Sequence, residues 1–182
     1  MKDSATTTDR TCPACGEGAL QARVDKESVE YGGKTEDLAL RFTVCDHCGA
    51  ELTGAEDASH NKRAMNAFKK SVDDLLSGNE IRAFRKRLRI NQKLAAQLLG
   101  GGPVAFSRYE SDDIVQSAAM DTALRLCIAS PSNLLPLAQQ KEIDLPGKTV
   151  ERITHNEKDQ LLFMIRAIRN QQEQVAEGEP GS

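Results

Sequence analysis

Apolar and polar side chains alternate in the first third of the chain. Apolar residues occupy every second position from Leu38 to Val44. This period of two predicts a half-buried β-strand. Residues 20–24 alternate in the same way, and the Tyr-Gly-Gly-Lys sequence at 31–34 is typical of a turn between strands. Residues 11–52 are therefore predicted to form a small β-module.

From residue 53 onward, the apolar positions take the spacing of a helix. Met65, Phe68 and Val72 recur at intervals of three and four within residues 53–76. This pattern predicts a linker helix over residues 53–78 that joins two domains, with Ser77-Gly78-Asn79 at its end. Its apolar face could dock on a neighbouring domain or pair two protomers, and the sequence leaves both possibilities open.

Residues 79–140 have the pattern of a small helical domain. Asn91 is a good N-cap for a helix that runs to Leu99, and the three glycines at 100–102 break that helix before Pro103 begins the next. Two short helices joined by a glycine turn form the layout of a helix-turn-helix. An earlier helix and two later ones, over residues 117–130 and 132–140, complete a predicted five-helix core.

Both ends of the chain differ from these modules. Residues 1–10 are polar, which predicts a disordered N-terminus without a secretory signal. Residues 141–182 form an extension with a joint at 146–147, an amphipathic helix around 161–168 and a polar tail expected to be disordered. No stretch approaches the roughly 18 consecutive apolar residues of a membrane span, so we expect no integral membrane protein.

Two pairs of cysteines are the strongest chemical signal in the sequence. Cys12 and Cys15 form the first pair, Cys45 and Cys48 form the second, and 29 residues separate the two pairs. In each pair, a tight turn lets two thiolates grip one metal ion. Two such turns supply the four soft ligands of a tetrahedral Zn²⁺ site. Because the protein fills every ligand position, we expect one structural zinc ion and no catalytic metal.

Other roles for these cysteines are less well supported by the residues. Disulfides require an oxidising compartment, and a redox-active pair normally opens a helix in a βαβ unit. Iron in the same four-thiolate site is chemically possible, whereas a zinc deaminase needs an HxE motif that the sequence lacks. His47 is expected to face solvent and Cys127 to be a small core residue. The predicted fold class is α+β: a zinc-bound β-module, then an all-α helix-turn-helix domain and a C-terminal helical extension.

The net charge of −3 is distributed unevenly along the chain. Residues 79–110 carry a net charge of +5, whereas the segments before and after this block each carry −4. A basic block in an acidic chain is the electrostatic footprint of a face that binds a polyanion, although an ordinary solvated helix gives the same excess. The chain is 39% hydrophobic and contains no Trp, which favours two small cores over one large enzyme core.

The second helix of the helix-turn-helix carries the side chains best suited to reading DNA bases. Arg108 can donate two hydrogen bonds to O6 and N7 of guanine in the major groove, and Ser107 precedes it. Gln92 and Lys93 are suited to phosphate contacts. Phe106 and Tyr109 are more typical of packing than of base reading. The predicted DNA-binding residues are Arg85, Arg87, Asn91, Gln92, Lys93, Val104, Ser107, Arg108 and Tyr109.

The order of these motifs resembles the MqsA family of antitoxins. That family also has two CxxC knuckles at nearly this spacing, a Gly-x-Lys-Thr turn like residues 32–35, and a helix-turn-helix similar to residues 92–110. The resemblance covers residues 11–140 and implies a cytoplasmic bacterial type II antitoxin. Its zinc domain would neutralise a cognate toxin, commonly an mRNA-cleaving endoribonuclease. Its Xre/Cro-like domain would form a homodimer and repress its own operon at a palindrome in double-stranded DNA.

The resemblance implies that Arg108 is a base-reading residue and that the four paired cysteines are zinc ligands. The sequence departs from the family in three places. Val104 stands where the family can have a base-reading Asn, and residues 141–182 extend beyond the common core. The glycine that usually follows the second helix is also missing, so residues 111–113 must end that helix. Asp tolerates the left-handed conformation better than most residues, which keeps the fold possible.

We therefore expect a binding protein rather than an enzyme. The motifs contain no nucleophile–base pair, carboxylate pair or open metal site, which argues against a small nucleic-acid enzyme. The alternative is a stand-alone transcription regulator whose zinc module senses metal, redox state or a protein other than a toxin. This alternative predicts the same DNA binding but no toxic product from a neighbouring gene.

Overall fold

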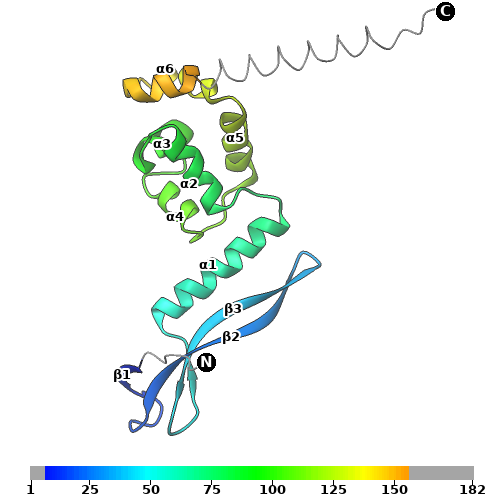
Figure 1. Ribbon diagram of the computed structural model, residues 1–182, viewed down its shortest axis with the longest axis vertical. Coiled ribbons are helices and arrows are strands. Elements are labelled where there is room, and N and C mark those ends of the chain that lie inside the picture. Colours follow the sequence, from blue (N-terminus) through cyan, green and yellow to red (C-terminus); the bar gives the residue numbers. More distant parts are fainter. Residues whose placement is uncertain (1–6, 156–182) are drawn as a thin grey trace, which may run out of the picture. The chain divides into compact units, whose positions relative to one another are not determined.

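The computed structural model describes residues 7–155, with side chains from residue 11 onward. Two compact units make up the chain. Among these residues, the first unit joins residues 7–80 with Ser107–Ser117, and the second joins Ile81–Phe106 with residues 118–155. The helix predicted around residues 161–168 lies outside the described residues. An antiparallel sheet followed by helices confirms the predicted α+β class (Figure 1).

The sheet has four antiparallel strands in chain order: β1 (Thr7–Thr11), β2 (Ala19–Tyr31), β3 (Lys34–Cys45) and β4 (Glu51–Leu52). The alternating segments found in the sequence lie in β2 and β3, as predicted. β4 gave no sequence signal because it is so short. β1 includes residues 7–10, which were expected to be disordered, and pairs with the start of β2.

A two-residue turn closes the long hairpin of β2 and β3. Gly32 and Gly33 have φ angles of 56° and 74°, and Tyr31 pairs with Lys34 across the turn. A turn with two successive positive φ angles matches the twist of the flanking strands, and glycine adopts it without strain. This explains the turn predicted at residues 31–34.

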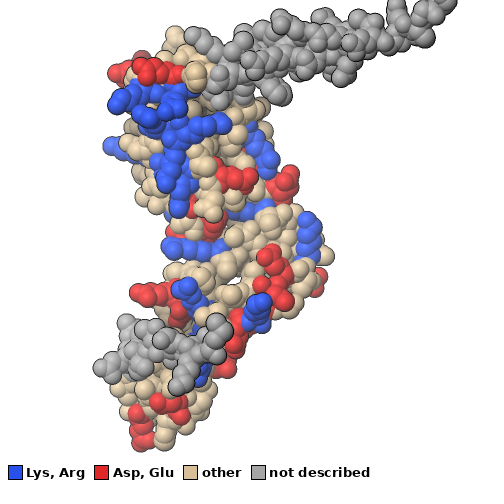
Figure 2. Space-filling model, in the orientation of Figure 1, with Lys and Arg blue, Asp and Glu red and all other residues tan. Residues whose placement is uncertain are grey.

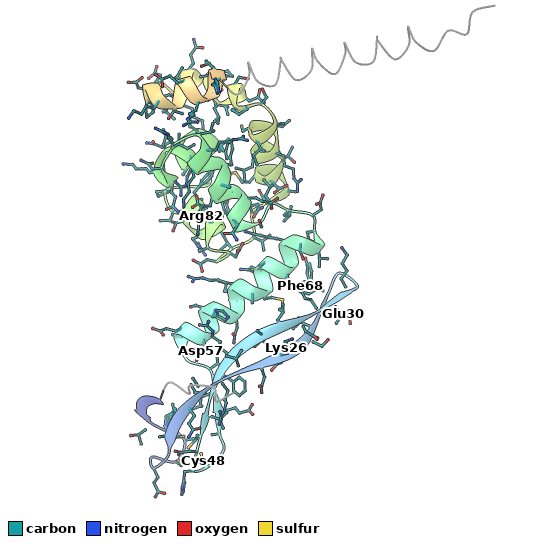
Figure 3. All side chains as sticks on the ribbon, viewed as in Figure 1. Lys26, Glu30, Cys48, Asp57, Phe68 and Arg82 are labelled. Carbon is teal, nitrogen blue, oxygen red and sulfur yellow. The ribbon has the colours of Figure 1, made fainter. Side chains whose placement is uncertain are left out.

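Helix α1 (Ala55–Val72) packs along β3 within the first unit. The side-chain amide of Asn61 donates to the carbonyl of Arg41 and accepts from its N–H, both at 2.8 Å. The Phe68 ring meets Tyr31 edge-on, with 6.5 Å between centroids. Figure 3 shows Phe68 toward the hairpin tip, whereas Cys48 lies at the other end of the hairpin.

Helix α1 ends earlier than the apolar spacing predicted. The last helical residue is Val72, and Asp74 has a φ of 51°, which turns the chain out of the helix. Leu76 is buried although it lies beyond the helix. Its apolar side chain therefore continues the helical spacing in the sequence after the helix itself has ended. Residues 77–79 do not end this helix, because Gly78 begins the next one.

The helical elements are α2 (Gly78–Arg87), α3 (Gln92–Leu99), α4 (Ala105–Glu110), α5 (Ala118–Ala129), a short 3₁₀ turn (Pro131–Asn133) and α6 (Leu134–Gln140). They confirm the five predicted helices. Residues 147–155 are also helical. The second unit buries a core of Ile81, Phe84, Leu88, Ile90, Ala95, Leu98, Phe106, Leu124, Cys127, Leu134 and Ile153.

Two predictions from the sequence of the helical domain are confirmed by the structure. The Asn91 side chain accepts a hydrogen bond from the Leu94 N–H at 2.8 Å, which confirms the predicted N-cap. Cys127 is buried in α5, as expected of a small core residue. Within residues 7–155 there is no helix that is both long and apolar enough to cross a membrane.

Candidate metal centre and nucleic-acid interface

The two cysteine pairs lie in turns of the same construction. The Gly16 N–H donates to the Cys12 carbonyl at 2.8 Å, and the Gly49 N–H donates to the Cys45 carbonyl at 3.0 Å. Both glycines have positive φ angles, 75° and 73°. Backbone N–H groups also point at sulfur: that of Cys48 lies 3.5 Å from Cys45 Sγ. Glycine lets each turn close tightly enough for this approach.

The four sulfur atoms converge to one point. Cys12 Sγ lies 3.8 Å from Cys48 Sγ, and Cys15 Sγ lies 3.7 Å from Cys45 Sγ. All four sulfur atoms lie within 4.8 Å of one another. A tetrahedral zinc ion with Zn–S bonds of about 2.3 Å places its sulfur ligands about 3.8 Å apart. The cluster therefore fits a four-thiolate metal ion of this size, and the sulfur donor set suits zinc or iron.

The surroundings shift the thiol pKa of Cys15 and that of Cys48 in opposite directions. N–H groups of Gly18 and then Glu17 lower the pKa of the Cys15 thiol to about 6. The N–H of Ala50 lowers the pKa of the Cys48 thiol. Hydrogen bonds from the other cysteines, chiefly Cys45, and the desolvation of the sulfur outweigh this effect and raise the pKa to about 12. A divalent cation favours the thiolate at every ligand, which is the charge that this cluster requires.

His47 stays outside the cluster, as the sequence predicted. Its side chain is 59% exposed, and its Nε2 lies 3.1 Å from a carboxylate oxygen of Glu17. The imidazole therefore faces solvent beside the second pair of cysteines.

Sequence reasoning missed two residues that support the metal centre. A Cβ on Gly18 would lie only 2.3 Å from Cys45 Sγ, so a side chain at this position would displace a ligand. Asp46 Oδ1 accepts from the Ala19 N–H at 2.8 Å, and the Asp46 N–H donates to the Ala19 carbonyl at 3.1 Å. These bonds fasten the second turn to the start of β2. Neither contact has a local sequence signal, because the partners lie far apart along the chain.

The predicted DNA-binding residues of the second unit fall into two groups. Arg85 is half-buried and donates to the Ile90 carbonyl at 2.9 Å, while the Asn91 side chain caps α3. Lys93 and Arg87 are exposed, although one Arg87 nitrogen lies 3.2 Å from the Ile128 carbonyl. Figure 2 shows Lys and Arg side chains gathered over the helices of this unit. Gln92 is half-exposed, and Val104 is exposed just before α4.

Helix α4 separates its residues sharply by exposure. Ser107 and Arg108 are exposed, whereas Phe106 and Tyr109 are buried. Packing is therefore the main role of both aromatic rings, and little of Tyr109 is left for a ligand. Asp112, just beyond the helix, has a φ of 58°, which confirms that an Asp provides the left-handed turn in place of glycine.

A small β-module whose four cysteines can hold one metal ion, followed by a helix-turn-helix domain, defines the class of this protein. The family model for MqsA, the antitoxin component of a bacterial toxin–antitoxin system, matches residues 10–136. The chain therefore belongs to the MqsA antitoxin family. It is 28% identical over 125 residues to "Antitoxin MqsA" of Escherichia coli (strain K12), which covers 68% of this chain and 95% of that relative.

Replacing one ligand should empty the metal centre. We expect Cys45→Ser to lower the zinc content from about one ion per chain to near zero and to unfold residues 11–52, because the module has little other core. Elemental analysis and limited proteolysis measure both effects. Cys127→Ala is the matched control and should keep its metal, since Cys127 lies outside the cluster. Full zinc content in Cys45→Ser would contradict the four-ligand site.

A methyl group on Gly18 should weaken the site without removing a ligand. We expect Gly18→Ala to lower zinc affinity by about 10- to 100-fold, the usual effect of disturbing groups that support metal ligands. Competition with a chromophoric chelator measures the affinity. Gly54→Ala is the control, because a Cβ there would meet only Asp57 Oδ2 at 3.8 Å. Equal affinities for the two variants would show that the close approach at Gly18 is tolerated.

Proposed function

We propose that this protein is the antitoxin of a toxin–antitoxin pair, with no catalytic activity of its own. Its zinc module binds and neutralises a cognate toxin, an mRNA endoribonuclease, and its helical domain represses the protein's own operon as a dimer on a palindrome. The observation that carries this proposal is the extent of the family match, which spans both modules in one stretch from residue 10 to residue 136. The converged cysteines and the exposed Arg108 support it.

Operator reading rests on the exposed side chains near the two helices of the helix-turn-helix. Arg108 supplies a bidentate contact to guanine, and Ser107 contacts the neighbouring base or phosphate. Gln92 and Lys93 contact phosphate at the N-terminus of α3, where the positive end of the helix dipole also attracts an anion. Val104 offers only an apolar contact, as to a thymine methyl group. Arg85 and Asn91 act indirectly, because their side chains already bond to the backbone.

Dimerisation can use the exposed face of α5. Leu126 is 58% exposed, although it lies in a helix with buried neighbours. Ala119, Thr122 and Ala129 are exposed on the same side at helical spacing. We assign this face of α5 to contact with a second copy of the chain. A palindromic operator requires two copies of the DNA-recognition helix about 34–36 Å apart.

Toxin binding can use the free edge of β2. The outer edge of β3 is already occupied, because Asn61 engages the backbone of Arg41 there and β4 pairs with Thr43 and Val44. Among the described residues, β1 covers β2 only at Ala19–Gln21. In the part of the chain that the structure describes, the rest of β2 has no neighbouring strand on this edge, and its backbone groups can accept a strand from a partner. The exposed Val24 adds apolar area at this edge.

Loss of the guanine contact should reduce operator affinity. We expect Arg108→Ala to weaken binding to DNA from upstream of its own gene by about 10- to 100-fold at fixed salt, with binding to unrelated DNA nearly unchanged. Fluorescence anisotropy at several salt concentrations measures both affinities. Arg23→Ala, an exposed arginine of the zinc module, is the control. An equal loss on both DNA sequences would show that Arg108 contacts only phosphate.

A charge on α5 should separate the dimer. We expect Leu126→Glu to be monomeric at micromolar concentration, because a carboxylate cannot be buried unpaired in an interface. Sedimentation equilibrium measures the mass. Val24→Glu replaces a side chain of nearly equal exposure, 59%, and should remain dimeric. A dimeric Leu126→Glu variant would place the interface elsewhere.

Co-expression tests the antitoxin function itself. Each gene adjacent to that of this chain is expressed in a bacterial host, alone and together with this protein, and surviving colonies are counted. We expect one neighbour to kill and this protein to rescue growth. Val24→Glu should rescue poorly, whereas Val104→Glu, outside the zinc module, should rescue as well as the unmodified chain. If no neighbour is toxic, the stand-alone regulator becomes the better description.

A further inference from the structure

Helix α1 carries a lysine that is almost completely buried. Lys70 is 1% exposed, although a lysine is rarely found inside a protein unless its charge is paired. Its Nζ donates to Asp112 Oδ1 at 2.7 Å and to the Tyr109 carbonyl oxygen at 3.0 Å. Both acceptors belong to the carboxyl end of α4 and the turn that follows it. A buried ammonium group therefore joins α1 to the helix that carries Ser107 and Arg108, within the first unit.

The same turn is held by further polar contacts. The Gly78 N–H donates to Asp112 Oδ1 at 3.2 Å, and the Asn66 side chain donates to the Asp112 carbonyl at 2.8 Å. Arg63 Nε lies 2.6 Å from Asp113 Oδ1, and this ion pair lowers the pKa of the Asp113 carboxyl. Gly78 also packs so close that a Cβ on it would lie 2.7 Å from the Glu110 carbonyl oxygen. The end of α4 is thus enclosed by polar partners.

Helix α4 needs such external support. It contains six residues, far too few to be stable on its own, since isolated helices shorter than about 12 residues are marginal in water. A cation on the last carbonyl groups also complements the negative end of the helix. Tyr109 directly follows Arg108, and the Arg108 carbonyl accepts from the Asp113 N–H at 2.9 Å. Displacement of this turn would therefore move the backbone that carries Arg108.

Lys70 also accounts for a departure from the family pattern. The glycine that usually follows this helix would adopt a positive φ freely, whereas here Asp112 adopts it at 58°. An aspartate adopts this conformation less readily than glycine, although better than most residues, and the Asp112 side chain is only 24% exposed. Lys70 neutralises that carboxylate and holds the turn closed. The pair Lys70–Asp112 thus performs the task of the missing glycine.

We propose that Lys70 is a positioning residue for operator reading: it fixes the direction in which α4 presents Arg108 to the bases, acting through Asp112 and the Tyr109 carbonyl. The proposal rests on the proposed DNA-binding function of α4. Lys70 is too buried to contact DNA itself. A bidentate arginine–guanine contact depends on the placement of both donor nitrogens, so a tilt of α4 reduces selectivity more than it reduces attraction to phosphate.

The test uses the full chain and three variants. Lys70→Met removes the charge at similar length and should weaken binding to the upstream DNA about tenfold, with binding to unrelated DNA and the zinc content unchanged. The double variant Lys70→Met/Asp112→Gly removes both charges and restores glycine to the left-handed position. It should recover affinity to within about threefold of the unmodified chain. Phe68→Leu, on the hairpin side of α1, is the control for general destabilisation and should keep operator affinity.

Hydrogen exchange makes the positioning role measurable without DNA. The amides of Ser111 and Asp113 bond to the carbonyls of Ser107 and Arg108 at the end of α4. In Lys70→Met these amides should exchange about tenfold faster, with no comparable change in Phe68→Leu. A Lys70→Met variant with unchanged exchange and unchanged affinity would overturn the proposal, as would an equal loss of operator affinity in Phe68→Leu.

The same data separate this proposal from the proposed function. If the unmodified chain does not prefer its upstream DNA, or if Arg108→Ala binds that DNA normally, operator reading by α4 is wrong. Positioning for operator reading is then wrong too, whereas faster exchange in Lys70→Met would still identify Lys70 as the support of the helix end. If Arg108→Ala loses selectivity and Lys70→Met does not, only the positioning role is wrong.

Discussion

The convergence of four thiols onto one point is the constraint on which the N-terminal module depends. The buried cluster at this end of the sheet consists of Cys12, Leu20 and Cys45, so two of its three members are themselves ligands. Such a cluster buries far too little apolar surface to order the two turns and the strand ends around it on its own. A metal ion held by the four thiols would take the place of a hydrophobic core, and we expect the strands next to the two turns to depend on it.

Helix α1 organises the remainder of the first unit. One side of it holds the hairpin through Asn61 and Phe68, and Lys70 holds the turn after α4. The packing therefore does not follow the order of the chain. Ser107–Ser117 belong to the first unit, whereas the residues on either side of this segment belong to the second unit. The cysteine cluster, the hairpin and the end of α4 belong to the same unit, which gives the two proposed binding activities a common structural support.

The sequence predicts those features that depend on local spacing. The cysteine pairs, the alternation of β3, the Gly-Gly turn and the Asn91 cap each occupy a few consecutive positions, and the structure has them where they were expected. The left-handed turn at Asp112 was also predictable, because the sequence requires a helix end where glycine is missing.

Features that depend on long-range contacts were not predictable. A side chain at position 18 is excluded only because Cys45 of β3 approaches it. Lys70 has the sequence pattern of an exposed residue on a linker helix, and only the fold brings Asp112 to it. The end of α1 was misplaced because Leu76 continues the apolar spacing beyond the turn at Asp74. For Gly18 and Lys70, the contacting residue is distant in sequence. For α1, the helix end depends on the backbone angle at Asp74, which the pattern of side chains does not reveal.

Amide hydrogen exchange of the full chain, before and after removal of zinc by a chelator under reducing conditions, tests this account most directly. If the metal replaces a core, the amides of residues 11–52 lose their protection on chelation, while residues 81–106 and 118–155 keep theirs. If residues 11–52 stay protected without metal, or if the helices of the second unit lose protection together with the module, the central claim is wrong.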